Sequence, residues 1–405
     1  MIDKFVSIIR KQTHLQSIVH FLMDTIGSIA FRFFWIFPIN DDKIVFCNFN
    51  GKGYGDNPKY ICEEVLKRNL YNDIVWLVFS DTVSITDFPK SIRLVSKYSL
   101  NACYELATAS VWINNVRMDG YIRKRKKQIY IQTWHGVLAL KKVEADIMDS
   151  IKWYVRSAKN DSKMANVFLS GANIQTSLFQ SSFWYSGNIL EVGSPRNDIV
   201  LHQAEHDFRK KISDFLFLDI EDILDKKIVL YAPTFRDTAD ISVYNLDYSS
   251  CMLALGDKFG GNWILLYRLH PNISEYANSL DIKDKTNVYD VSSYPDMQEL
   301  LAVSDVLITD YSSCMFDFSL SLKPCFLYVP DLSDYINDDR GVYYQIDQLP
   351  YPSYKTNNDL GIGISNFDSK QYLRDLTSFF QLVQSFELGN ASQKVVDWII
   401  SKKGI

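Results

Sequence analysis

Short apolar runs, each followed by a polar loop and then by a segment of helical character, recur along most of this chain. In the first half we expect strands at Lys43–Phe49, Ile74–Phe79, Ile92–Val95, Val111–Asn114, Gln128–Gln132, Val167–Ser170 and Ile189–Val192. In the second half we expect them at Lys227–Leu230, Trp263–Tyr267, Val288–Asp290, Val306–Thr309 and Cys325–Val329. Helices are predicted at Tyr60–Arg68, Glu205–Leu218, Met297–Val303, Ser313–Leu322 and within Lys370–Lys402. Strands that alternate with helices predict parallel sheets with helices on both faces.

The length of the chain predicts more than one domain. It has 405 residues, whereas single hydrophobic cores stop growing at about 250–300 residues. The break between the halves falls near Ser194–His202, after the loop GSPRND. We therefore expect an α/β protein with two doubly wound, Rossmann-like domains that face each other across a cleft. Their predicted bounds are residues 41–200 and 201–405, with terminal helices in the second and a separate helical segment at residues 1–40.

Charge and cysteine content exclude several classes of protein. The net charge of -5 gives no general attraction to nucleic acid. The six cysteines form no C-x-x-C pair, and no nearby histidine completes a zinc site, so we expect buried, reduced thiols of a cytosolic protein. No acidic cluster has the spacing of metal ligands, and we expect no obligatory metal. The glycine-rich signatures of ATP hydrolysis and dinucleotide redox chemistry are also missing from the sequence.

The segment Ser17–Phe37 is strongly apolar and close to the length of a membrane span. His20, Asp24 and Arg32 interrupt it, and charged groups inside a membrane are costly. We expect a helix that lies in the membrane interface, with a packed first helix of the N-terminal domain as an equal alternative and a transmembrane helix as a less favoured one. The basic run Arg123–Lys127 is either a solvated turn or a further attraction to acidic headgroups.

Two of the six histidines directly follow predicted strands. His135 stands in QTWHG, and His270 stands in YRLHPN, two residues after Arg268. Ligands of open parallel sheets bind at the carboxyl ends of the strands. A single histidine in such a place is usually structural, but one in each domain points to a site. Since histidine titrates near neutral pH, it suits proton transfer.

The segment Thr309–Phe318, TDYSSCMFDF, combines a strand end with hydroxyls at the start of a predicted helix. Ser312 and Ser313 either cap this helix or, with its free amides and dipole, bind a phosphate. Asp317 lies one turn further on, where its carboxylate either accepts hydrogen bonds from ribose hydroxyls or is an ordinary exposed acid.

Two further loops carry arginines. YAPTFRD follows a predicted strand and contains Thr234 and Arg236, while GSPRND contains Arg196. The guanidinium fork of arginine matches phosphate oxygens, so we expect an anion near these loops. Lys141 and Lys142, which follow the His135 loop, add positive charge.

The runs QTWHGVLALKKVEADI, GSPRND, YAPTFRD, RLHPN and DVLITDYSSCMFDFSLSLKPCFLY together resemble the CDP-glycerol glycerophosphotransferase family, which makes teichoic acids and related capsule polymers. The resemblance extends from about Lys43 to about Gly341. It implies a GT-B type fold, which agrees with two facing α/β domains. Many polymerases of the family read WHGTPLK where this chain reads WHGVLALKK, so it is more similar to shorter capsule-type members, and this motif leaves the acceptor unspecified.

The resemblance also implies roles for individual residues. His135 is similar to the family's proposed catalytic base, and His270 to a second histidine that is important for activity. The expected donor-binding residues are Arg196, Thr234, Arg236, Arg268, Ser312, Ser313 and Asp317. The expected acceptor-side residues are Trp134, Gly136, Lys141 and Lys142, and the domain of residues 41–200 is then the acceptor side.

We therefore expect an enzyme that transfers glycerol phosphate, or another polyol phosphate, from a CDP-polyol to a hydroxyl of a lipid-linked cell-envelope glycan, with release of CMP. CDP-glycerol or CDP-ribitol would be a co-substrate, and no other cofactor is expected. The enzyme would sit peripherally on the cytoplasmic face of the cell membrane. The alternatives are a GT-B glycosyltransferase that moves a sugar from a nucleotide donor, and a non-catalytic nucleotide-binding protein of the membrane surface.

Overall fold

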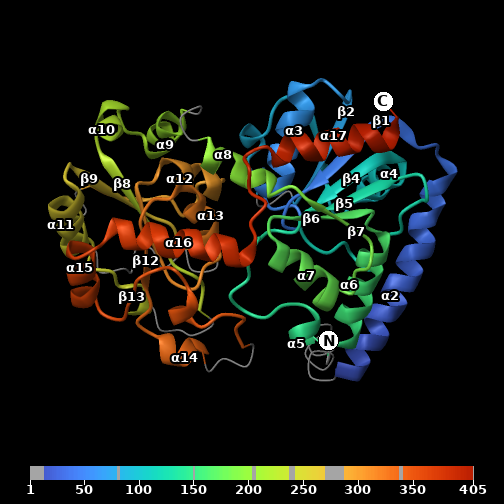
Figure 1. Cartoon of the computed structure of the whole chain (residues 1–405). Coiled ribbons are helices and arrows are strands. Elements are labelled where there is room, and N and C mark those ends of the chain that lie inside the picture. Colours follow the sequence, from blue (N-terminus) through green and yellow to red (C-terminus); the bar gives the residue numbers. More distant parts are fainter. Residues whose placement is uncertain are drawn as a thin grey trace, which may run out of the picture. The chain divides into compact units, whose positions relative to one another are not determined.

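A computed structural model describes residues 13–79, 83–148, 151–202, 207–236, 242–269, 287–336 and 341–404. The chain forms two compact units (Figure 1). The first contains residues up to His135, Val143–Arg196 and Asn390–Ile405, and the second contains Gly136–Lys142 and Asn197–Gly389. The expected α/β class with two doubly wound domains is confirmed by the two parallel sheets, one in each unit. The units are not simple halves of the sequence, because the loop after His135 belongs to the second unit and the C-terminal helix to the first.

The first unit is built on a seven-stranded parallel sheet with the order β3-β2-β1-β4-β5-β6-β7. Its strands are β1 (Asn40–Cys47), β2 (Asp73–Val78), β3 (Ile92–Ser96), β4 (Ala109–Asn114), β5 (Ile129–Gln132), β6 (Val167–Ser170) and β7 (Asn188–Glu191). Its helices include α2 (Thr13–Phe33), α3 (Asp56–Lys67), α4 (Leu100–Thr108), α5 (Ala145–Met148), α6 (Lys152–Met164), α7 (Asn173–Ser182) and α17 (Ala391–Lys403). Single 3₁₀ turns lie at η1 (Phe34–Ile36), η3 (Ile85–Asp87) and η4 (Pro195–Asn197).

Two apolar layers cover the faces of this sheet. On one face the strands pack against α3 and against Val395, Val396 and Ile399 of α17, which lies beside α3 (Figure 1). On the other face they pack against α4 and against Phe31, near the end of α2. The C-terminal helix therefore completes the core of a sheet whose strands come from the first half of the chain.

The second unit is built on a six-stranded parallel sheet with the order β10-β9-β8-β11-β12-β13. Its strands are β8 (Lys227–Ala232), β9 (Trp263–Tyr267), β10 (Val288–Asp290), β11 (Val306–Thr309), β12 (Cys325–Tyr328) and β13 (Ser353–Tyr354). Its helices include α8 (Asp198–Leu201), α9 (Phe208–Leu216), α10 (Glu221–Leu224), α11 (Tyr248–Phe259), α12 (Met297–Val303), α13 (Cys314–Phe318), α14 (Leu332–Ile336), α15 (Asn357–Ser365) and α16 (Ser369–Val383). Single 3₁₀ turns lie at η6 (Ser242–Tyr244), η8 (Ser319–Ser321) and η9 (Ile346–Gln348).

Each sheet has a point where the strand order reverses. In the first unit it lies between β1 and β4, and in the second between β8 and β11. Loops that leave neighbouring strands at such a point turn to opposite faces of the sheet, which opens a crevice at the carboxyl ends of the strands. We therefore expect a ligand-binding site in the loops that follow these four strands.

The expected N-terminal helix is present as α2, followed by η1. Most of its large apolar side chains are exposed, among them Met23, Ile26 and Phe33. Within the described residues, Gln16–Ile36 is the one helical stretch that is long and apolar enough to cross a membrane by length and composition. The alternative of a fully packed first helix does not fit this exposure.

Candidate functional site

His135 follows β5. It is held by groups that follow β1 and β4, the two strands on either side of the point where the strand order reverses. Its Nδ1 atom lies 2.8 Å from the main-chain oxygen of Asn115, the residue after β4. A carbonyl oxygen only accepts hydrogen bonds, so Nδ1 carries the hydrogen, and in the neutral ring Nε2 keeps its lone pair. No hydrogen bond to Nε2 arises from the part of the chain that the structure describes. Burial lowers the pKa of His135, and the charge of Arg196 adds to this, whereas Asp56 opposes it.

The ring of His135 lies among aromatic side chains. The centroids of the Trp134 and His135 rings are 4.3 Å apart, and the Phe49 ring lies 5.2 Å from that of His135. Behind Trp134, the Arg117 guanidinium lies 5.7 Å from the indole and forms ion pairs with Glu144 and Asp161. These contacts fix the direction of the His135 ring from its apolar side.

The side chain of Arg196 is bound by groups of the first unit. Its Nη1 donates to the carboxylate of Asp56 and to the main-chain oxygen of His135, both at 2.6 Å. Arg196 therefore lies beside the histidine, and its expected contact with the donor stays a prediction. Asp56, Asn57 and Asn115, which hold this region together, were not expected from the sequence. They follow β1 and β4, so the rule that polar residues after parallel strands form sites would have found them.

In the second unit, Arg236 lies between two carboxylates. Its Nη2 donates to Asp310 at 2.8 Å, and its Nε donates to Asp331 at 2.7 Å. Although burial opposes the charge, these two acids raise the pKa of Arg236. Thr234 donates from its hydroxyl to Asp310 at 2.7 Å. Arg236 and Thr234 thus tie together the loops that follow β8, β11 and β12, and their expected contact with phosphate stays a prediction.

Arg268, directly after β9, has different surroundings. Its Nη1 donates to the main-chain oxygen of Tyr294 at 2.5 Å, and within the described residues no carboxylate lies at ion-pair distance. Burial lowers its pKa, and this is only partly offset by Asp296 and by Cys314 in α13. A half-buried guanidinium that is held through one carbonyl is well suited to accept an anion.

The hydroxyls of Ser312 and Ser313 lie in the loop after β11, and both residues are half-buried. Ser312 accepts from the amide of Cys314 at 3.4 Å, while Ser313 makes no side-chain cap of the helix. The expected helix at Ser313–Leu322 is only five residues long, Cys314–Phe318, and continues as η8. Its dipole is therefore small, and an anion here would rest mainly on the hydroxyls and on nearby cations.

Asp317 is buried beneath this loop. Its two oxygens accept from the side-chain amides of Asn197, at 3.1 Å, and Gln298, at 3.0 Å. The alternative of an ordinary exposed helix acid is therefore wrong, since the side chain is 3% exposed. Its expected contact with a ribose stays a prediction.

The acceptor-side residues after His135 pack on the second unit. A Cβ atom placed on Gly136 would lie 3.9 Å from the Ser313 hydroxyl. The ammonium group of Lys141 lies 4.1 Å from the centre of the Tyr335 ring, which also stacks on Tyr311. The main-chain amide of Lys142 donates to Gly341 at 3.1 Å. His270, the second expected catalytic residue, lies outside the described residues.

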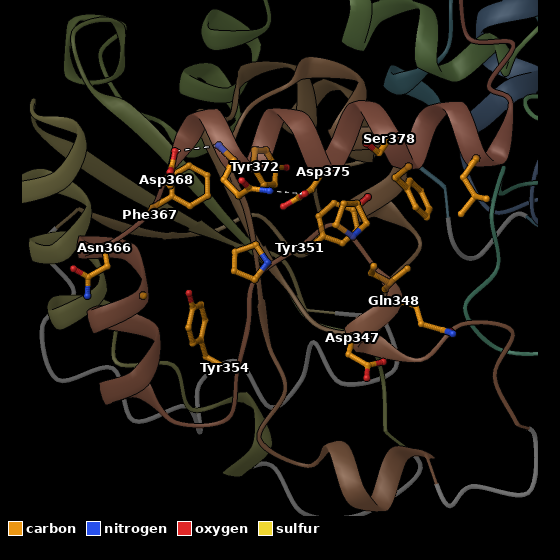
Figure 2. Close-up of a pocket in the computed structure, with 17 residues that line it drawn as sticks. Asp347, Gln348, Tyr351, Tyr354, Asn366, Phe367, Asp368, Tyr372, Asp375 and Ser378 are labelled. Carbon is orange, nitrogen blue, oxygen red and sulfur yellow. Dashed lines mark hydrogen bonds between the residues drawn. The ribbon is translucent and has the colours of Figure 1, made fainter.

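A separate hollow of about 690 Å³ lies on the second unit, between α16, α15 and the segment around η9. Figure 2 shows Tyr351, Tyr354 and Tyr372 around it, with Asp375 on α16 and Asp368 directly before that helix. No expected donor-binding residue lines it, and its described lining contains no basic side chain. It is therefore unsuited to a pyrophosphate, which needs positive charge.

The chain is similar to known proteins over most of its length. The sequence profile described as CDP-Glycerol:Poly(glycerophosphate) glycerophosphotransferase matches residues 29–401. A teichoic acid poly(glycerol phosphate) polymerase of Bacillus spizizenii is 31% identical over 391 residues, which cover 94% of this chain and 97% of that protein. A teichoic acid glycerol-phosphate transferase of Staphylococcus aureus is 32% identical over 373 residues, or 89% of this chain and 93% of that one. A poly(glycerol phosphate) polymerase of Staphylococcus epidermidis is 33% identical over 375 residues, 89% of this chain, but the match spans only 51% of that protein.

Solved structures point to the same family of proteins. The wall teichoic acid polymerase TagF superposes with a TM-score of 0.78 and 30% identity, over 97% of this chain and 98% of that one. Structures of TagF include a variant soaked with CDPG. The match over most of the chain and the shared fold lead to one assignment: this chain belongs to the CDP-glycerol:poly(glycerophosphate) glycerophosphotransferase family.

Proposed function

We propose that this protein transfers glycerol phosphate from CDP-glycerol to a hydroxyl of a lipid-linked cell-envelope glycan of the teichoic acid type. Family membership supports the donor class and the reaction. Among the observations on the site, the hydrogen bond between Nδ1 of His135 and the oxygen of Asn115 carries the proposal furthest. It leaves Nε2 as a neutral, uncommitted base at the end of a strand.

In this proposal Nε2 of His135 takes the proton of the acceptor hydroxyl. The acceptor oxygen attacks the β-phosphorus of CDP-glycerol, the bond from that phosphorus to the bridging oxygen breaks, and CMP leaves with the bridging oxygen. Phosphoryl transfer depends mainly on positioning and electrostatics, so no covalent intermediate with the protein is required.

The second unit supplies the donor contacts. Arg268 provides positive charge that no described carboxylate neutralises at ion-pair distance. Ser312 and Ser313 offer hydroxyls to the same anion, and Arg236 keeps their loop in place through Asp310. In the sequence His270 is two residues after Arg268 and is proposed as a further contact with the transferred phosphoryl group.

The first unit also supplies a membrane-facing surface, formed by α2 and the basic loop Arg123–Lys127. Asp24 and His20 turn inward on α2: a Cβ atom on Gly120 would meet the Asp24 carboxylate, and His20 stacks on Trp153 at 4.3 Å. The exposed side of α2 is apolar. A helix whose exposed side is mainly apolar, with Asp24 and His20 on its packed side and Arg32 exposed near its end, suits the interface of a bilayer.

The basic loop lies at the end of this helix. Arg125 donates to the main-chain oxygens of Phe37, at 2.8 Å, and Phe34, at 2.9 Å, while Lys126 and Lys127 remain exposed. Cations beside an apolar surface favour anionic lipid headgroups. These observations support our proposal that the enzyme is a peripheral protein of the cytoplasmic face of the cell membrane, where it would meet a lipid-linked acceptor.

The test is to incubate the full chain and a lipid-linked glycan acceptor with CDP-glycerol, CDP-ribitol or UDP-sugars, and to measure release of CMP or UDP. We expect acceptor-dependent release of CMP from CDP-glycerol. Release of UDP instead would establish a glycosyltransferase. Nucleotide binding without any turnover would overturn the assignment of an enzyme.

A further inference from the structure

The helix α3, which follows β1, begins with Asp56 and Asn57, and these two residues take no part in the reaction proposed above. Asp56 is the first residue of α3, is buried, and has a φ of 54°. This left-handed conformation is unfavourable for residues other than glycine, although Asp and Asn adopt it more readily than most. Such a conformation persists where surrounding contacts hold it, and it is frequent near functional sites.

The Asp56 carboxylate touches both polar groups that hold His135. Its Oδ1 accepts from the side-chain amide of Asn115 at 3.1 Å, and its Oδ2 accepts from Nη1 of Arg196 at 2.6 Å. Asn115 in turn accepts from Nδ1 of His135, and Arg196 donates to the main-chain oxygen of His135. One carboxylate thus connects the two groups that set the ring and the backbone of the histidine.

Asn57 extends the same contacts by one residue. Its side-chain amide donates to the main-chain oxygen of Trp134 at 3.0 Å, and its Oδ1 accepts from the main-chain amide of Arg196 at 3.1 Å. Trp134 has a φ of 53°, so the turn that presents His135 is itself in a left-handed conformation. Asp56 and its neighbours therefore hold three adjacent groups, which are the Trp134 oxygen, the His135 oxygen and the His135 ring.

We propose that Asp56 is a positioning residue for His135, which it acts on through Asn115 and Arg196 without touching the substrates. This inference rests on the proposed function, since it takes His135 as the base. The charged groups around the histidine are Asp56, Arg196 and Glu144. The negative charge of Asp56 raises the pKa of His135, so its loss favours the neutral ring, and loss of its contacts with Asn115 and Arg196 loosens the direction of Nε2.

Two variants separate these effects. Asp56→Asn removes the charge but keeps an oxygen that can accept from Asn115. Asp56→Gly removes the whole side chain, while glycine adopts the left-handed conformation without strain. The matched control is Glu105→Gln, because Glu105 is likewise buried and ion-paired, with Lys43 at 2.6 Å and Arg93 at 3.0 Å, but lies at the opposite, amino-terminal edge of the same sheet.

For each variant we would measure the thermal midpoint, the affinity for CDP-glycerol, kcat and KM, and the pH dependence of kcat. We expect Asp56→Asn to lower kcat about tenfold and Asp56→Gly about 10²-fold, the size of effect that misplacement of a reacting group causes. Donor affinity should stay within about twofold, and the acid limb of the profile should move to lower pH, as loss of a nearby negative charge requires. Glu105→Gln should lose stability but keep both kcat and its pH limb.

The tautomer of His135 provides a second readout in protein labelled with ¹⁵N-histidine, in which the His135 signal is assigned by its loss in His135→Asn. We expect Nδ1 to carry the hydrogen in the wild type and a mixture of tautomers in Asp56→Asn. Variants of Asp56 that lose only stability, as Glu105→Gln does, would overturn the positioning role. If the wild type itself does not release CMP from CDP-glycerol, the proposed function fails, whereas an unchanged tautomer in an active enzyme defeats only this inference.

Discussion

The Nδ1 atom of His135 donates a hydrogen bond to the main-chain oxygen of Asn115 across 2.8 Å, from a loop after β5 to the residue after β4. The two strands are neighbours in the sheet, and β4 lies at the point where the strand order reverses. The hydrogen on Nδ1 is therefore directed to a main-chain oxygen that the topology of the sheet brings beside the ring. A base held in this way can exchange its proton at Nε2 without losing its orientation.

The pH dependence of the reaction should reveal this environment. His135 must be neutral to accept a proton, so activity rises as pH increases through its pKa. Because burial lowers that pKa from the ordinary value of 6.5, the acid limb of kcat/KM should fall below pH 6.5. The measurement is a profile of CMP release between pH 5 and pH 8 in buffers of constant ionic strength. An acid limb above pH 7 would contradict a buried neutral base.

Replacement of His135 by alanine should act on chemistry and not on donor affinity. Loss of a general base typically lowers the rate by about 10²–10⁴, whereas the proposed donor contacts belong to the second unit. We expect CDP-glycerol binding, measured by calorimetry, to stay within a few-fold of the wild type. Turnover close to that of the wild type would remove His135 from the mechanism.

The double substitution Ser312→Ala with Ser313→Ala should weaken donor binding. Neither hydroxyl is needed as a strong cap, since Ser312 accepts only at 3.4 Å and Ser313 makes no cap. Ser321→Ala is the matched control, because Ser321 is a half-buried serine near the end of the same segment and donates to the oxygen of Phe318 at 2.7 Å. Calorimetry with CDP-glycerol should show weaker binding only in the double variant. Equal affinity in all three proteins would mean that these serines serve only the local fold.

Arg268→Gln should also weaken donor binding, by about tenfold or more, since a charge-assisted hydrogen bond to phosphate contributes roughly twice as much as a neutral one. The control is Arg209→Gln. Arg209 is likewise half-buried and donates to the main-chain oxygens of Ile223 and Lys226, but it is paired with Asp305 at 3.4 Å. We expect Arg209→Gln to lower stability and to leave CDP-glycerol affinity unchanged. If Arg268→Gln lowers stability and leaves CDP-glycerol affinity unchanged, Arg268 has only a structural role.

The buried strands were predictable from the sequence because their apolar runs are continuous. The predicted bounds of β6, β9, β10 and β11 agree with the structure residue for residue, and those of the other predicted strands are close. The short edge strand Ser353–Tyr354 was not predicted, since a strand of two residues leaves no periodicity to detect. Likewise, the expected helix Ser313–Leu322 divides after Phe318, where local hydrogen bonds turn it into a 3₁₀ turn.

Long-range contacts explain what the sequence did not reveal about the site. Motifs in the sequence identified His135. They did not identify Asp56, because its contact with Arg196 joins residues that are 140 positions apart. Similarly, Arg236 and Asp331 are 95 positions apart, so an arginine that appears ready for phosphate is in fact held by acids. Pairing of this kind depends on which strands are neighbours, and no local pattern in a single sequence specifies strand order.

The exposed side of α2 should hold the protein on anionic membranes. Ile26 and Phe33 are 66% and 71% exposed, so their replacement by aspartate disturbs no core. Charge in the interfacial face of a helix opposes its burial among acyl chains. We therefore expect the double variant Ile26→Asp with Phe33→Asp to fold normally but to lose flotation with vesicles that contain acidic lipid.

Leu382→Asp is the control for this variant, because Leu382 is 72% exposed on α16 of the second unit and should not matter for membrane binding. A peripheral enzyme should be released from vesicles by high salt or alkaline carbonate, since its cations contribute about 1 kcal/mol each near an anionic surface and are screened by salt. A requirement for detergent would instead establish a spanning helix. If the wild type does not float with anionic vesicles at all, α2 is not a membrane contact, and its apolar face must serve another partner.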